Sequence, residues 1–132
     1  MSVPAAGHRP PLRVVLTGSE STGKTTLARA LAGAYGIDWV PEFVRAYAGA
    51  KGAPLVLDDH GPIAHGQMAL EDAHRARAIE RGDAIVVQDT DLLSTVVYCE
   101  HYYGTCPAWV AAAARERRPD LYLLLEIDVP WA

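Results

Sequence analysis

Cysteine is scarce in this 132-residue sequence, which contains only Cys99 and Cys106. Long apolar stretches are absent as well: no run approaches the roughly 18–20 residues of a membrane-spanning helix. The N-terminal segment MSVPAAGHRPP has no apolar core of the kind found in signal peptides. Two thiols without a secretion signal are typical of a protein in the reducing cytoplasm. The sequence therefore predicts a cytoplasmic protein with no membrane partner.

Positive charge is also in short supply. The 12 Lys and Arg residues are outnumbered by 16 Asp and Glu residues, which gives a formal net charge of −4. This balance argues against a nucleic-acid partner. Hydrophobic residues make up 50% of the chain and charged residues 21%, as in ordinary globular domains. We expect one domain over residues 12–132, preceded by a disordered, proline-rich lead-in over residues 1–11.

A phosphate-binding motif lies at the start of the expected domain. Gly18 is followed by four residues and then by Gly23, Lys24 and Thr25, which matches the pattern G-x-x-x-x-G-K-[ST]. A short, β-branched run over residues 12–16 precedes the motif, as a buried strand would, and a helical pattern follows it. This strand–loop–helix context predicts a binding site for a nucleoside triphosphate.

The chemistry of the motif follows from its residue types. Gly18 and Gly23 permit backbone torsions that a Cβ atom would forbid, so the N–H groups of residues 19–25 can point at an anion. The N-terminus of the next helix adds partial positive charge. Lys24 supplies a full charge for the β- and γ-phosphates, and the Thr25 hydroxyl is placed to ligate Mg²⁺.

Strand and helix patterns alternate along the rest of the chain. Helical spacing predicts a helix directly after the motif, and a long one from an N-cap at 57–59 to residue 81. Such alternation gives a parallel sheet with right-handed crossovers. The predicted fold is α/β, a three-layer P-loop NTPase fold with about four parallel strands and helices on both faces. The expected strands cover residues 12–16, 36–40, 84–88 and 121–127, and the other helices cover 43–50, 92–103 and 107–117.

Carboxylates follow the predicted strands. In a parallel α/β sheet, sites gather at the carboxyl ends of the strands, so we expect Glu42, Asp89, Asp91 and Asp128 at the same edge as the motif. Asp89 is the first choice for a second Mg²⁺ ligand, directly or through a water molecule. Asp91 either contributes to the chemistry or caps the following helix, a frequent role of aspartate.

Glu42 is a candidate general base, because an acceptor hydroxyl must lose a proton as it attacks a γ-phosphoryl group. The other interpretation is a carboxylate that interacts with the dipole of the following helix. Arg45 lies three residues further on, on the same helical face. There it would hold Glu42, contact a substrate hydroxyl, or form a surface ion pair.

Aromatic residues make up only 8% of the chain, yet several gather between residues 98 and 109. Tyr98 and Trp109 are the preferred candidates for stacking on a planar base or pyridinium ring, with core packing as the alternative. Cys99, His101 and Cys106 fall in the same segment. They lack a fourth ligand and a C-x-x-C spacing, so they give little support for a metal site.

Four segments together resemble the ribosylnicotinamide kinase domain of NadR-type bacterial NAD-biosynthesis proteins. They are GSESTGKTTLARALA, WVPEFVRAYA, DTDLLSTVVYCEHYYGTCPAWV and DLYLLLEIDVPW. The likeness extends from Leu12 to Trp131. It implies a phosphotransferase that uses ATP and Mg²⁺ to convert nicotinamide riboside into nicotinamide mononucleotide.

Carried over by position, the resemblance implies roles for individual residues. It places Glu42, Arg45 and residues 89–91 around the riboside and the metal, and it places the segment from Tyr98 to Trp109 along the nicotinamide pocket. It leaves the general base open between Glu42 and Asp89. The residues that would hold the ATP phosphates are Gly18, Ser19, Glu20, Ser21, Thr22, Gly23, Lys24, Thr25 and Thr26.

The chain departs from the family pattern at two points. Ala46 stands where family members usually carry an acidic residue. The chain also ends at Ala132, before the family's Arg-containing lid, further helix and last strand. We therefore expect a domain that is incomplete at its C-terminus and whose open apolar surface allows a homo-oligomer. The alternatives are a kinase for another nucleoside, or an ATP-binding protein with reduced or lost activity.

Overall fold

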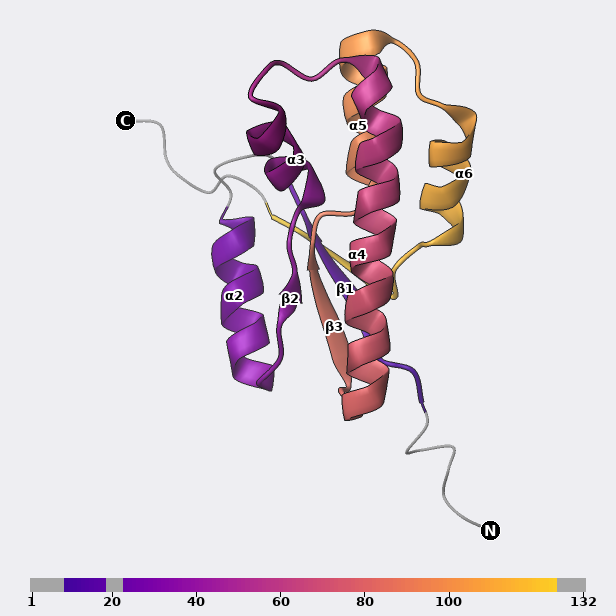
Figure 1. Ribbon diagram of the computed structural model, residues 1–132. Helices are drawn as coiled ribbons and strands as arrows, with labels where there is room; N and C mark the ends of the chain where they lie inside the picture. Colours follow the sequence, from indigo (N-terminus) through magenta and orange to yellow (C-terminus); the bar gives the residue numbers. More distant parts are fainter. Residues whose placement is uncertain (1–8, 19–22, 126–132) are drawn as a thin grey trace.

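The computed structural model describes residues 9–18 and 23–125 (Figure 1). No helix within these two ranges is long and apolar enough to cross a membrane. Predictions for residues 1–8, 19–22 and 126–132, Asp128 included, fall outside the described residues. The elements in chain order are β1 (Leu12–Thr17), α2 (Lys24–Tyr35), β2 (Trp39–Val40), α3 (Phe43–Lys51), the 3₁₀ turn η1 (Leu57–Asp59), α4 (His60–Arg81), β3 (Ile85–Asp89), α5 (Leu92–Tyr103), α6 (Ala108–Glu116) and β4 (Leu121–Leu124).

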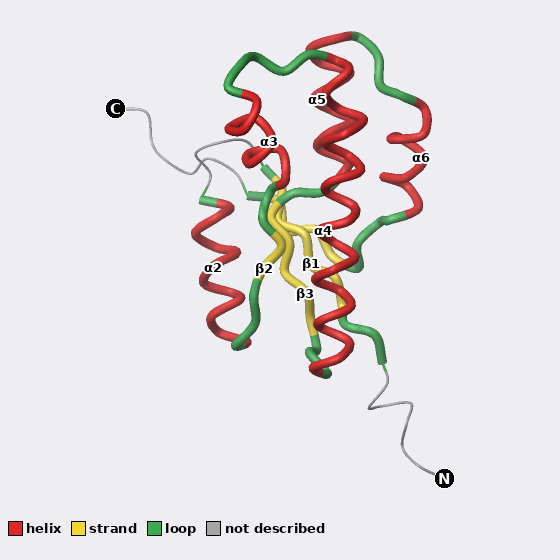
Figure 2. The backbone as a smooth tube through the Cα atoms, viewed as in Figure 1, coloured by secondary structure: helices red, strands yellow, loops and turns green. Residues whose placement is uncertain are grey.

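The four strands form one parallel sheet in the order β2-β3-β1-β4. Successive side chains of a strand face opposite sides of a sheet. Val87 belongs to one buried cluster with Ala28 of α2, whereas Val86 belongs to another with Ala78 of α4. Figures 1 and 2 likewise place α2 on one side of the strands and α4 on the other. The predicted three-layer α/β fold is confirmed.

The strand register brings the predicted site together. Leu16 of β1 lies opposite Asp89 of β3, and Val40 of β2 lies opposite Gln88 of β3. The carboxyl ends of these three strands therefore reach nearly the same level. The segments that follow them contain the phosphate-binding motif, Glu42 and the residues after Asp89, so one edge of the sheet collects all three.

The second strand is shorter than its apolar run. β2 covers only Trp39–Val40 of the expected 36–40. Gly36 ends α2 with φ at 68°, in the left-handed region, and its N–H donates to the last carbonyl groups of the helix. The chain is therefore still turning at Gly36. It forms a strand only at Trp39–Val40, the last two residues before the carboxyl end of β2.

β4 is an edge strand that pairs with β1. Leu121 and Leu124 on it are 50% and 69% exposed. An edge strand with apolar side chains presents groups that can pair with another chain. The homo-oligomer expected from the sequence stays a prediction.

Asp59 ties α3 to the start of α4. Its carboxylate accepts hydrogen bonds from the Tyr47 hydroxyl at 2.8 Å, the Lys51 ammonium at 2.5 Å and the Val56 N–H at 2.7 Å. The Lys51 contact, followed by the two other donors, lowers the pKa of Asp59 from 3.8 to about 2. This carboxylate fixes the loop that leads into α4.

Asp59→Asn is expected to destabilise the protein near neutral pH and to lose this effect in acid. A carboxyl group whose pKa is lowered by folding stabilises the folded state above its unfolded pKa of 3.8, and this contribution disappears as the pH falls toward about 2. Urea unfolding over this pH range measures the effect, with exposed Asp58→Asn as the control. If the difference in the free energy of unfolding between Asp59→Asn and the wild type did not change with pH, the proposed stabilisation by the Asp59 carboxylate would be contradicted.

Candidate active site

Lys24 is the central charge of the site. It begins α2 directly after Gly23, whose φ of 84° lies in the left-handed region that glycine adopts readily. The Lys24 side chain is 7% exposed, and its Nζ lies 3.7 Å from Glu42 Oε1 and 3.9 Å from Asp89 Oδ1. Nζ also donates to Thr90 Oγ1 at 3.0 Å. Three segments that are distant in sequence thus meet at one ammonium group.

The two predicted metal ligands are in direct contact. Thr25 Oγ1 donates to Asp89 Oδ2 at 2.9 Å. A hydroxyl and a carboxylate beside a phosphate-binding motif fit Mg²⁺, because this ion takes hard oxygen ligands and usually one or two carboxylates with phosphate oxygens and water. The described residues contain no group of three or more His, Cys, Asp or Glu side chains that could hold a metal. The alternative metal site at Cys99, His101 and Cys106 therefore gains no support.

Thr90 lies within the segment 89–91 that the resemblance places at the site, but its contact with Lys24 was not expected from the sequence. It has φ at 68° and is the only non-glycine among the described residues with positive φ. For a β-branched residue this conformation costs about 1–3 kcal/mol. Its N–H donates to Leu16 O at 2.8 Å, and Gln88 Nε2 donates to its carbonyl at 2.9 Å. The strained backbone directs Oγ1 toward Lys24; the only sequence signal was its place between two aspartates.

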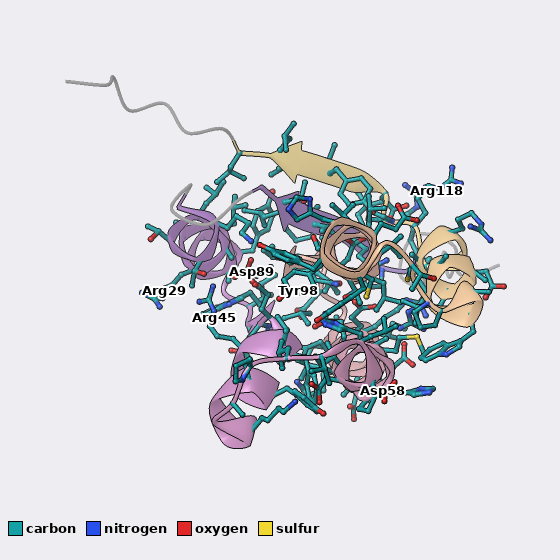
Figure 3. The ribbon with its side chains drawn as sticks, turned by 90° about the horizontal axis from the view of Figure 1, so that it is seen from above. Arg29, Arg45, Asp58, Asp89, Tyr98 and Arg118 are labelled. Atoms are coloured by element: carbon teal, nitrogen blue, oxygen red, sulfur yellow. The ribbon has the colours of Figure 1, made fainter. Side chains whose placement is uncertain are left out.

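A cavity of about 720 Å³ extends from the phosphate-binding motif to the aromatic side chains of α5. Figure 3, which looks down on the molecule, places Arg45, Asp89 and Tyr98 near one another between α2, α3 and α5. The cavity is therefore lined by elements from both halves of the described chain. Among its lining residues are Lys24, Glu42, Arg45, His60, Gln67, Thr90 and Tyr98.

Glu42 and Arg45 form the predicted pair at the entrance of α3. Arg45 NH2 lies 3.6 Å from Glu42 Oε1, and the two side chains are 57% and 9% exposed. Glu42 is therefore held between the guanidinium of Arg45 and the ammonium of Lys24. The contact fits both an Arg45 that holds Glu42 and a surface ion pair, and a contact of Arg45 with a substrate hydroxyl stays a prediction.

Aromatic rings build the far end of the cavity. His60 is 2% exposed, and its ring centroid lies 5.0 Å from that of Tyr98. The Tyr103 hydroxyl donates to Leu55 O at 3.2 Å, so its oxygen accepts from His60 Nε2–H at 3.1 Å. Burial lowers the pKa of His60 from its usual 6.5, against the opposing influence of Asp59. Burial therefore favours the neutral imidazole.

Two predicted substrate contacts have other partners. Trp109 of α6 stacks on His65 of α4 with ring centroids 4.4 Å apart, and it does not line the cavity. The expectation that it contacts substrate is not supported by this position. Asp91 lines the cavity but caps α5 by accepting from Leu93 N–H at 3.2 Å, and it accepts from the Tyr122 hydroxyl at 2.6 Å. The capping interpretation is confirmed; a substrate contact of Asp91 stays a prediction.

Gly66 of α4 makes room for Phe43, the residue that follows Glu42. A Cβ atom at position 66 would lie 2.2 Å from Cε2 and Cζ of the Phe43 ring, far closer than two carbon atoms can approach. The missing side chain at position 66 thus determines how closely the start of α3 packs on α4.

Gly66→Ala is expected to lower the free energy of unfolding by up to about 2 kcal/mol. Overpacking usually costs about 1–3 kcal/mol, and replacing a helical glycine with alanine offsets up to about 1 kcal/mol of this cost. Gly49→Ala in α3 is the matched control, because nothing lies within 4 Å of the added Cβ. It is expected to stabilise the protein. Urea unfolding compares the variants, and stabilisation by both would contradict the packing described here.

These features define a P-loop nucleotide-binding protein. The motif joins the first strand of a parallel sheet to the following helix, and carboxylates from neighbouring strand ends surround its lysine. The chain belongs to the AAA domain family, which matches residues 13–132.

Two curated relatives of this chain share one name. The chain is 32% identical over 122 residues to the trifunctional NAD biosynthesis/regulator protein NadR of Escherichia coli (strain K12). It is 32% identical over 122 residues to the protein of the same name from Salmonella typhimurium (strain LT2). Each match covers 89% of this chain and 29% of the relative. The chain therefore spans less than a third of the length of these relatives.

Solved structures agree with this relationship. A crystal structure of NadR in complex with NR superposes with a TM-score of 0.66 at 29% identity, covering 86% of this chain and 33% of that one. The crystal structure of NadR in complex with NAD and AMP-PNP superposes with a TM-score of 0.68 at 28% identity. This match covers 89% of this chain and 35% of that one. The crystal structure of thymidylate kinase from Ehrlichia chaffeensis superposes with a TM-score of 0.58 at 20% identity. This match covers 91% of this chain and 74% of that one, and it supports the fold alone.

Proposed function

We propose that residues 12–132 form a kinase-like domain that transfers a phosphoryl group from ATP to the ribose hydroxyl of nicotinamide riboside, which yields nicotinamide mononucleotide. The observation that carries the proposal is the cavity that joins Lys24 and Glu42 to the ring wall of His60 and Tyr98. One end offers charge for phosphates, and the other offers flat surfaces for a base. The likeness to NadR, including its structure with NR, supports this acceptor.

Each polar residue at the edge of the sheet has a role in this proposal. Lys24 binds the β- and γ-phosphates and balances their charge. Thr25 and Asp89 hold Mg²⁺, which supplies further neutralisation of the phosphate oxygens. Glu42 accepts the proton of the attacking ribose hydroxyl. Because Asp89 is bonded to the Thr25 hydroxyl, Glu42 is the better choice of the two candidate bases, and Arg45 orients it.

The ring wall suits a cationic base. The pyridinium ring of nicotinamide riboside carries a positive charge, which is attracted to the faces of aromatic side chains. A protonated histidine would repel this ring, whereas the neutral form of His60, which burial favours, does not. The Glu42 carboxylate in the same cavity adds a further attraction. A neutral nucleoside would gain less from these surroundings.

An acceptor panel tests the proposal. The protein is incubated with ATP, Mg²⁺ and, separately, nicotinamide riboside, thymidine, uridine or adenosine, and the products are identified by chromatography with mass detection. We expect nicotinamide mononucleotide and ADP in equal amounts. Transfer only to another nucleoside would replace the acceptor in this proposal. Calorimetric binding of ATP without transfer to any acceptor would instead favour a nucleotide-binding protein without kinase activity.

A further inference from the structure

A buried polar cluster lies beneath the candidate active site. It consists of Gln67 and Glu71 of α4 and Gln88 of β3, which are 6%, 5% and 0% exposed. Gln67 Nε2 and Gln88 Nε2 both donate to Glu71 Oε2, at 3.0 and 2.5 Å. The other oxygen, Glu71 Oε1, accepts from Arg117 Nε at 3.2 Å and lies 3.4 Å from Arg13 NH2. The carboxylate is thus surrounded by donors on both sides.

Two arms of this cluster reach the site. Gln67 Oε1 accepts the backbone N–H of Phe43 at 3.0 Å, directly after Glu42. Gln88 Nε2 uses its second hydrogen to donate to the Thr90 carbonyl at 2.9 Å, in the strained segment whose hydroxyl contacts Lys24. The hydrogen bond at Gln67 therefore ends beside the proposed base Glu42. The hydrogen bond from Gln88 ends at Thr90, which contacts Lys24.

The carboxylate at position 71 dictates how both amides are oriented. A carboxylate only accepts hydrogen bonds, so each carboxamide must turn its nitrogen toward Glu71. This orientation points the oxygen of Gln67 at the Phe43 N–H, and it leaves one hydrogen of Gln88 for the Thr90 carbonyl. It also points Gln88 Oε1 at Arg13 Nε, which donates to it at 2.9 Å.

We propose that Glu71 is a positioning residue: through Gln67 and Gln88 it fixes Glu42 and Thr90, the two groups that contact Lys24 together with Asp89. The catalytic consequence rests on the proposed kinase function, whereas the orientation of the amides does not. The cluster residues Gln67, Glu71 and Gln88 belong neither to the phosphate-binding motif nor to the carboxylates at the strand ends. Glu71 also does not line the cavity.

Glu71→Gln is the informative substitution because it keeps the shape and removes the acceptor-only character. One Oε becomes an NH₂ group, which must face either the two amide nitrogens or the two guanidinium groups. When the new NH₂ faces the two amide nitrogens, donors point at donors. Turning the Gln67 amide over removes its part of this clash but places its own NH₂ against the Phe43 N–H. Turning Gln88 over places its NH₂ against Arg13 Nε and removes the donor to Thr90. Either relief breaks a bond at the site.

The test compares Glu71→Gln and Glu71→Asp with Glu80→Gln, the same substitution at an exposed position of α4. Amide hydrogen exchange of Phe43 measures the hydrogen bond from its N–H to Gln67 without any substrate. We expect Glu71→Gln to accelerate this exchange about tenfold, which corresponds to the loss of one hydrogen bond. With nicotinamide riboside as acceptor, kcat is expected to fall about 10–100-fold at nearly constant KM. Circular dichroism and thermal unfolding establish that each variant is folded.

The order of the two Glu71 variants separates orientation from packing. Aspartate keeps the acceptor-only charge but is shorter, whereas glutamine keeps the shape; we therefore expect slower Phe43 exchange and higher kcat for Asp than for Gln. The reverse order, or Glu71→Gln behaving like Glu80→Gln, would overturn the proposal. If the wild type phosphorylates no acceptor, the proposed function fails, and the Phe43 exchange still decides whether Glu71 orients the amides.

Discussion

Lys24→Ala is expected to reduce turnover by about 10²–10³-fold, as does removal of one preorganised group that stabilises developing charge in an enzyme site. The ammonium lies within 4 Å of Glu42 and Asp89 at the edge of the sheet, 3.7 and 3.9 Å away. Without it, these carboxylates face the phosphates of ATP with no neighbouring lysine, so both affinity for ATP and transfer should fall. Calorimetry with ATP and Mg²⁺, together with a turnover assay, measures the two effects.

Arg29→Ala is the control for this variant. It removes a positive side chain from the exposed face of the same helix, where the guanidinium lies 5.6 Å from the centroid of the Trp39 ring, outside the cavity lining. We expect its ATP affinity and turnover to match those of the wild type. Turnover of Lys24→Ala equal to that of Arg29→Ala, with both proteins folded by circular dichroism, would remove Lys24 from the mechanism.

Glu42→Gln is expected to lower kcat by about 10²–10⁴-fold, the range that general base catalysis contributes. The substitution preserves the shape of a side chain that is 9% exposed and removes its ability to accept a proton. Binding of ATP should persist, because the phosphate-binding motif is intact. A kcat within experimental error of the wild type would mean that another group accepts the proton.

Asp89→Asn provides the matched comparison for Glu42→Gln. Asp89 accepts from the Thr25 hydroxyl, so its loss should raise the Mg²⁺ concentration needed for half-maximal turnover. Glu42→Gln should lower kcat and leave the Mg²⁺ requirement unchanged. An exchange of these two signatures between the variants would assign the base to Asp89 and the metal contact to Glu42.

The phosphate-binding end of the site could be predicted because its signals are local or general. Gly23, Lys24 and Thr25 belong to a contiguous motif whose strand and helix context is visible in the sequence. The contact between Thr25 and Asp89 follows from the rule that parallel strands present their carboxyl ends at one edge. The register of β1 against β3 realises this rule.

The acceptor end could be predicted only in part, because aromatic residues at similar spacing have different fates. Tyr98 and Trp109 carry the same local signal, yet Tyr98 lines the cavity and Trp109 stacks on His65. His60 had no signal at all, since its role depends on burial and on the hydroxyl of Tyr103. The packing of α4, α5 and α6 against one another makes these distinctions.

The sequence by itself determined the class of fold, the phosphate-binding motif and the edge of the sheet at which carboxylates gather, because periodicity and short motifs report local conformation. Only the tertiary structure decided the strain at Thr90, the room that Gly66 leaves for Phe43, and the buried cluster around Glu71. The physical reason is that hydrogen bonds and close packing between residues distant in sequence depend on three-dimensional placement, which no local pattern encodes.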